Sequence, residues 1–127
     1  MKKTVVHTEA APAPFQGAPY NQAIRVGDLV FVAGQLGLRP GDTAVEGGIA
    51  QQTEQVLQNL AAILEAAGSS LENLVKTTVY LVELGDFAAM NEVYARHVGD
   101  TPPARATVGV SQLPSGALVE IEAVAHL

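Results

Sequence analysis

The chain has 127 residues, of which 48% are hydrophobic, and its 13 acidic against 7 basic residues give a formal net charge of -6 at pH 7. A chain of this length forms one domain and buries about two-thirds of the surface of its unfolded state. Because an acidic surface repels phosphate backbones, this charge disfavours nucleic acid as a partner. The sequence contains no cysteine, which excludes disulfides, thiol nucleophiles and cysteine metal sites and fits a reducing compartment.

The first residues do not resemble an export signal. "MKKTVVHTEAAPAP" has only Val5 and Val6 as an apolar run, whereas a signal peptide needs about 7 to 15 apolar residues. No apolar stretch of the sequence approaches the about 20 residues of a membrane span. We therefore expect a soluble, cytoplasmic protein that does not associate with a membrane.

The first third of the chain predicts strands joined by turns and loops. Residues 10–19 are rich in Ala and Pro and predict an irregular loop. "QAIRVGDLVFVAGQLG" then predicts a strand, a turn at Gly27 and Asp28, and a second, apolar strand over 29–33. "LRPGDTAVEGG" is expected to be the loop that leads into the first helix.

Two helices and three further strands follow. A helix is predicted over 49–67, where an apolar stripe recurs at helical spacing before a terminating glycine. An alternating, β-branched segment predicts a strand near 74–82. Asp86 is the predicted N-cap of a second helix that runs to about residue 98. The last two strands lie in "PPARATVGVSQLPSGALVEIEAVA", residues 102–125, where we expect a hairpin.

The predicted order is three strands, a helix, a strand, a helix and two strands. Each strand–helix–strand passage indicates a right-handed crossover between parallel neighbours, and tight turns indicate antiparallel pairs. Two amphipathic helices can cover only one face of the resulting mixed sheet. Since the other face still carries Val and Leu, we expect a second copy of the chain to cover it. A homo-oligomer follows, with no particular number of subunits.

The final hairpin carries unusual charges for an apolar segment. A tight pairing would place Thr107 opposite Glu120 and Arg105 opposite Glu122, all on one surface. One interpretation is a cross-strand salt bridge on a solvated face, which contributes a few tenths to about 1 kcal/mol. Apolar neighbours such as Leu118 favour partial desolvation of these charges instead, and a protein that retains costly desolvated charges usually uses them.

Other motifs of the sequence give no indication of a cofactor. The three histidines share no spacing and have no acidic partner at metal-ligand spacing. No G-x-S-x-G elbow surrounds the serines, and "EGGIAQQ" lacks the lysine of a phosphate loop. We expect no metal, nucleotide or prosthetic group.

Three stretches together resemble one known family. "GAPYNQAIRVGDLVFVAGQ", "LVKTTVYLVELGDFAAMNEVY" and "PPARATVGVSQLPSGALVEIEAVA" are similar to the Rid family of reactive intermediate deaminases, also called the YjgF group, over nearly the whole chain as one domain, 1–127. The resemblance implies an α+β, chorismate-mutase-like fold with a mixed sheet of about six strands and two helices on one face. It also implies a homotrimer around a central β-barrel, with active sites between subunits.

The resemblance also implies an activity and residues that carry it. The substrates would be 2-aminoacrylate and related enamines, which tautomerise to 2-imino acids and are hydrolysed without a cofactor to 2-oxo acids and ammonia. Arg105 would bind the substrate carboxylate and Glu120 would position or activate water, while Glu122 would be a counter-charge to Arg105 or an interface residue. The implied substrate-binding positions are Tyr20, Gly34, Phe87, Asn91 and Thr107.

The sequence departs from the family pattern at three positions, and other functions stay open. Ala18 occupies a position where many family members have glycine, Ala33 one where many have Ser or Thr, and Thr107 one where many have cysteine. The preferred imine is therefore undetermined. The first alternative is a regulatory trimer that binds small carboxylates without turnover. A single-strand endoribonuclease is a third candidate, disfavoured by the acidic charge and the lack of a basic aromatic patch.

Overall fold

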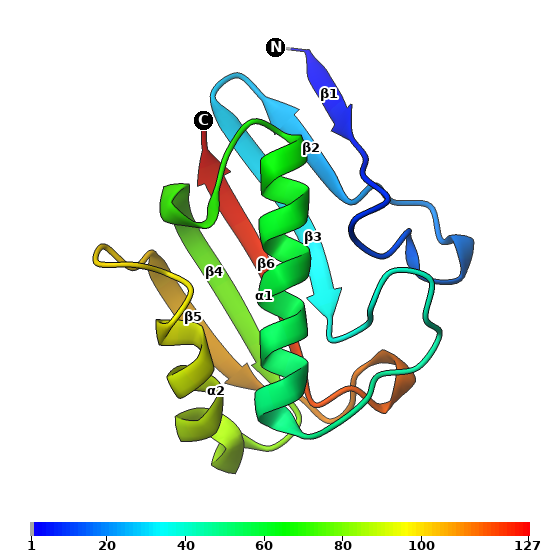
Figure 1. Cartoon of the computed structure of the whole chain (residues 1–127), viewed down its shortest axis with the longest axis vertical. Helices are drawn as coiled ribbons and strands as arrows, with labels where there is room; N and C mark the ends of the chain where they lie inside the picture. Colours follow the sequence, from blue (N-terminus) through cyan, green and yellow to red (C-terminus); the bar gives the residue numbers. More distant parts are fainter. Residues whose placement is uncertain (1) are drawn as a thin grey trace.

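The computed structural model describes residues 2–127 and contains one mixed six-stranded sheet in the order β1-β2-β3-β6-β4-β5 (Figure 1). The strands are β1 (Lys3–Val6), β2 (Ala23–Val26), β3 (Leu29–Leu36), β4 (Leu74–Leu81), β5 (Ala104–Gly109) and β6 (Val119–His126). The helices are α1 (Ile49–Ala66) and α2 (Phe87–Ala95). The predicted α+β class and the predicted order of elements along the chain are confirmed.

The pairing of the strands differs from the prediction at the end of the chain. The last two strands do not form a hairpin, because β6 pairs antiparallel with both β3 and β4, while β5 pairs parallel with β4 at the edge of the sheet. The passage through α2 therefore joins parallel neighbours, as expected. The passage through α1 joins β3 to β4, which are separated by β6.

Both helices pack on one face of the sheet, and their apolar side chains form the core. Val56, Leu60 and Ile63 of α1 are completely buried and belong to the same cluster as Val30 of β3 and Ile121 of β6. This is the stripe that the helical spacing predicts. Figure 1 shows α1 lying across the middle of the sheet, with α2 beside it near β4 and β5.

The helix ends agree with the prediction within a few residues. The α1 helix ends at Ala66, and Gly68 adopts the left-handed conformation, with a φ of +85°, that suits a helix stop. Asp86 occupies the N-cap position of α2, but its side chain makes no capping hydrogen bond. This helix ends at Ala95, earlier than the predicted residue 98.

The face of the sheet opposite the helices is uncovered and exposes several large apolar side chains. Leu29, Phe31 and Val108 are 41%, 46% and 42% exposed there, and Val5 shares this face because it pairs with Ile24, which in turn pairs with Phe31. Several exposed apolar side chains on one face of a sheet are typical of an interaction surface. None of the helices within residues 2–127 has the length and apolar character to cross a membrane.

Candidate active site

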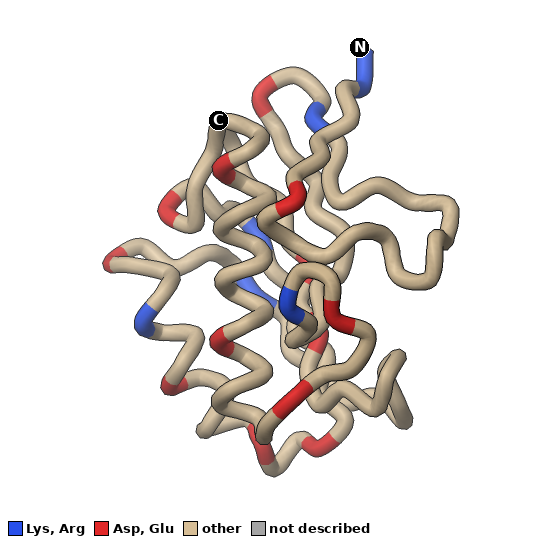
Figure 2. The backbone as a smooth tube through the Cα atoms, turned by 45° about the vertical axis from the view of Figure 1, so that its right-hand side comes forward, with Lys and Arg blue, Asp and Glu red and all other residues tan. Residues whose placement is uncertain are grey.

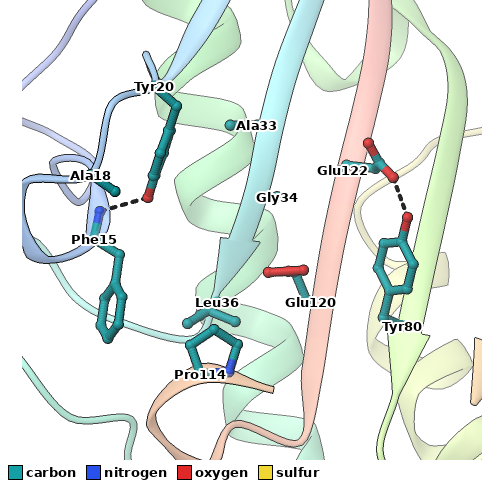
Figure 3. Close-up of a pocket in the computed structure, with 10 residues that line it drawn as sticks. All are labelled: Phe15, Ala18, Tyr20, Ala33, Gly34, Leu36, Tyr80, Pro114, Glu120 and Glu122. Carbon is teal, nitrogen blue, oxygen red and sulfur yellow. Dashed lines mark hydrogen bonds between the residues drawn. The ribbon is translucent and has the colours of Figure 1, made fainter. Parts of the chain in front are cut away.

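A cavity of about 400 Å³ opens beside β3 and β6 on the uncovered face of the sheet (Figure 3). Two phenols and two carboxylates, those of Tyr20, Tyr80, Glu120 and Glu122, line it. The rest of the wall is apolar or backbone and consists of Phe15, Ala18, Ala33, Gly34, Leu36 and Pro114. A mostly apolar hollow with a few convergent polar groups is typical of a small-molecule site.

Glu120 lies against the backbone of β3 beside Gly34, whose lack of a side chain leaves room for the carboxyl group. The register of β3 against β6 shifts between Val32 and Gln35, and the carboxyl group of Glu120 occupies the space beside Gly34. A Cβ atom on Gly34 would lie 2.9 Å from the Glu120 carboxyl carbon and 3.1 Å from its Oε2. Glycine at this position therefore allows the Glu120 carboxyl group to lie close to the β3 backbone.

The surroundings of Glu120 favour its protonated form. Partial burial raises the pKa of this carboxyl above its ordinary value, and the negative charge of Glu122 raises it further. Glu122 accepts a hydrogen bond from the Tyr80 hydroxyl, and this bond raises the pKa of Tyr80. A carboxylate whose pKa moves toward neutrality is better suited to accept and return a proton during catalysis.

The loop before β2 is fixed by one buried amide. Gln22 is 2% exposed, and its amide group donates to the carbonyls of Thr8 and Pro12 at 2.9 and 2.8 Å while accepting from the Thr8 N–H at 2.7 Å. The Phe15 N–H donates to the Tyr20 hydroxyl at 2.6 Å. These bonds place Tyr20 at the cavity wall.

A second group of predicted residues lies between α2 and β5. Phe87 and Asn91 are one helical turn apart on α2, and the Arg105 guanidinium carbon lies 5.4 Å from the centre of the Phe87 ring. Asn91 Oδ1 and Thr107 Oγ1 are buried and have no hydrogen-bond partner. Such orphaned polar atoms are rare in native proteins and point to a missing ligand or partner.

Within one chain, the two groups face opposite sides of the sheet. Arg105 pairs in register with Thr77 of β4, which is completely buried under the helices. Glu120 pairs with Tyr80 and Glu122 with Thr78, at the alternate positions of β4 that face away from the helices. The predicted pairing of Arg105 with Glu122 and of Thr107 with Glu120 on one surface is therefore wrong.

The structure thus gathers Tyr20, Gly34 and Glu120 in the cavity, and Phe87, Asn91, Arg105 and Thr107 at the β5 edge. Sequence reasoning missed Tyr80 as a cavity residue and Gln22 as the organiser of the loop. The alternation of β4 places Tyr80 on the face of Glu120, so this pattern could have revealed it, whereas nothing in the sequence singles out Gln22. Within residues 2–127, no cluster of three or more His, Asp or Glu side chains could hold a metal ion.

Comparison with known proteins identifies the family. The model of the family described as Endoribonuclease L-PSP matches residues 8–127. A RutC family protein of Pyrococcus abyssi is 51% identical over 127 residues, which cover 99% of this chain and 98% of that relative. The chain belongs to the Rid/YjgF family.

Solved and curated members of the Rid/YjgF family extend this result. The crystal structure of RidA from the Antarctic bacterium Psychrobacter sp. PAMC 21119 superposes on this fold with a TM-score of 0.93. The two sequences are 43% identical, and the match covers 98% of this chain and 99% of that chain. The 2-iminobutanoate/2-iminopropanoate deaminase of Mus musculus is 43% identical over 124 residues, which cover 97% of this chain and 90% of that relative. The predicted Rid fold is confirmed, and the family of this chain includes proteins named as imine deaminases.

Proposed function

We propose that the protein hydrolyses reactive 2-imino acids and enamines, of the 2-aminoacrylate and 2-iminopropionate type, to 2-oxo acids and ammonia. The observation that carries the proposal is the half-buried Glu120 carboxyl, held against Gly34 in a cavity that raises its pKa. Relatives named as imine deaminases support the same class of reaction. The proposal includes a single domain over 1–127 and a cytoplasmic location, which the absence of cysteine fits.

The proposed site needs two copies of the chain. Arg105 and Glu120 lie on opposite faces of the sheet in one chain, so a single molecule cannot offer both to one small substrate. The uncovered face, with its exposed apolar side chains, and the unpaired edge of β5 offer surfaces for a neighbouring copy. We propose a homotrimer in which Arg105 of one subunit faces the cavity of the next.

Each residue then has a chemical role. The planar Arg105 guanidinium holds the substrate carboxylate through two hydrogen bonds and fixes the position of the C=N carbon. Glu120 removes a proton from water as the water oxygen bonds to the carbon of the protonated imine, which gives a neutral carbinolamine. Glu120 then returns this proton to the carbinolamine nitrogen. The C–N bond breaks as the C=O bond forms, the hydroxyl proton passes to Glu120, and the departing ammonia takes this proton away as ammonium, which restores the carboxylate. The imine is already electrophilic, so this sequence needs no cofactor.

The test generates 2-iminopropionate in situ with an amino-acid oxidase and follows its disappearance and the release of ammonia. Arg105→Ala should lose about 2 kcal/mol or more of transition-state stabilisation, and Arg105→Lys should restore little because an ammonium cannot form the planar pair. Glu120→Gln should reduce turnover about 100-fold while affinity for a stable 2-oxo acid survives.

Two other functions predict different outcomes. If Arg105→Ala and Glu120→Gln both match the parent rate, the imine-hydrolase proposal fails and a small-carboxylate-binding trimer is the better description. The family description names an endoribonuclease, but the net charge of -6 and basic residues spread over separate segments (Figure 2) oppose binding to a polyanion. Degradation of single-stranded RNA that survives in both variants would favour that third function.

A further inference from the structure

The Arg105 guanidinium lies over two aromatic rings of α2. Its central carbon is 4.8 Å from the centre of the Tyr94 ring and 5.4 Å from that of the Phe87 ring. Both distances are within the about 6 Å over which a cation is attracted to an aromatic face. Among residues 2–127, no carboxylate forms an ion pair with Arg105, so the rings are its partners.

The two rings differ in how firmly they are held. Phe87 is 44% exposed, whereas Tyr94 is 5% exposed. The Tyr94 hydroxyl also shares a hydrogen bond of 2.6 Å with Thr77 Oγ1, and Thr77 is completely buried. Because a buried hydroxyl left without a partner is destabilising, this pair fixes the orientation of the Tyr94 ring.

The hydroxyl pair connects the ring to the strand beside Arg105. Thr77 is the register partner of Arg105 in the parallel β4–β5 pair. The contacts therefore connect the buried Thr77 hydroxyl to the Tyr94 hydroxyl, and the Tyr94 ring to the Arg105 guanidinium. An internal carboxylate would hold the arginine equally well, but it would occupy the N–H groups that an external carboxylate needs.

We propose that Tyr94, oriented by Thr77, is a positioning residue that fixes the plane of the Arg105 guanidinium so that its N–H edge stays free for a planar carboxylate. This inference rests on the proposed role of Arg105 as the carboxylate anchor. Stacking on the ring face restrains the guanidinium without consuming its donors. Asn91 on α2 and Thr107 on β5 each also carry a buried oxygen without a hydrogen-bond partner.

The experiment measures affinity for pyruvate, a stable 2-oxo acid, by calorimetry, and kcat and KM with 2-iminopropionate. Tyr94→Leu removes the aromatic face and should lower the affinity for pyruvate about 5- to 30-fold. KM should rise by a similar factor, and kcat should change less. Thr77→Val leaves the Tyr94 hydroxyl without its partner and should lower the affinity for pyruvate about two- to fivefold. Thr77→Ser keeps the hydroxyl and should restore parental affinity.

A matched control separates positioning from stability. Val93 is a buried residue of α2 that belongs to the core cluster. Val93→Ala should lower the thermal midpoint by shortening a core side chain, yet leave pyruvate affinity unchanged. A residue with only a structural role would instead show affinity losses that follow the loss of stability in all variants.

Parental affinity in Tyr94→Leu overturns the proposal, and so does an equal loss of affinity in Val93→Ala at matched stability. If Tyr94→Leu does not fold, parental affinity in Thr77→Val overturns the proposal in its place. The proposed function is tested separately. If the parent binds pyruvate and the variants lose affinity as expected, but the parent does not hydrolyse imines, the proposed function fails and the positioning role stands. If the parent hydrolyses imines but Tyr94→Leu and Thr77→Val keep the parental affinity, the positioning role fails and the proposed function stands.

Discussion

Replacing Gly34 by alanine tests whether the position of the Glu120 carboxyl matters. The added Cβ would lie 2.9 Å from the Glu120 carboxyl carbon, 3.1 Å from its Oε2 and 3.2 Å from its Cγ. All three contacts are with one side chain rather than with backbone. The substitution therefore displaces Glu120 and leaves the strands in place.

The size of the effect follows from these distances. Ordinary van der Waals contact begins at 3.4 Å, so the carboxyl carbon must move by about 0.5 Å. A misplacement of about 1 Å in a catalytic group can reduce a rate about 100-fold, and we expect Gly34→Ala to lower kcat about 10- to 100-fold. Gly34 has no left-handed φ, and alanine restricts the unfolded chain more than glycine, so the thermal midpoint should change little.

Steady-state turnover of 2-iminopropionate and a thermal melt are the two measurements. Gly85→Ala is the matched control, because its added Cβ would meet no atom within 4 Å and its φ is not left-handed. The control should retain both rate and stability. A Gly34→Ala variant with the parental kcat would refute the argument that the position of Glu120 against the β3 backbone is required for catalysis.

Three further predictions concern assembly and pH. Light scattering on the eluting protein should give about three times 13.2 kDa, and a monomer at micromolar concentration would remove the site between subunits. Glu122→Gln should move the acidic limb of the pH–rate profile to lower pH, because the charge of Glu122 raises the pKa of Glu120, and an unmoved limb would contradict this coupling. The hydrogen bond from His97 lowers the pKa of Glu54, so its contribution to stability is complete above the ordinary value of 4.5 and is lost as pH falls through the lowered pKa. Glu54→Gln should therefore reduce the loss of thermal stability on acidification, and an identical pH dependence would refute this.

The elements were predictable from local patterns, but the position of β6 was not. The stripe of α1 and the alternation of β4 reflect which side of each element meets the core. Alternation does not distinguish a central strand from an edge strand, and a short connection made a hairpin with β5 the simplest expectation. The inward positions of β6 include Val119, Ile121, Ala123 and Ala125, all buried, whereas its other side carries Glu120 and Glu122 beside Val124. An unbroken run of buried inward positions is compatible with a central strand or an edge strand, so the position of β6 could not be read from its pattern.

The site residues came from the family resemblance, while their arrangement came from the structure. A strand pattern assigns a residue to one of two faces but does not say which face the helices cover. The helix side of β5 could therefore be confused with the open side of β6, and Arg105 was expected beside Glu122. The hydrogen bonds of Gln22 reach residues that are 10 to 14 positions earlier in the sequence. They depend on the path of an irregular loop, and hydrophobic periodicity does not predict such a path.

The separation of the two halves of the site leads to a last prediction. Arg105→Ala keeps Glu120 and Glu120→Gln keeps Arg105, so each variant lacks one half of every site. In mixed trimers, a site would be complete wherever an intact Arg105 of one subunit meets an intact Glu120 of the next. Random mixing of the two inactive variants in equal amounts, by unfolding and refolding together, should create such sites at about a quarter of the interfaces and restore about a quarter of the parental activity. Each variant refolded alone is the control. If the mixture is no more active than the separate variants, Arg105 and Glu120 do not act on one substrate from different subunits, and the site between subunits is refuted.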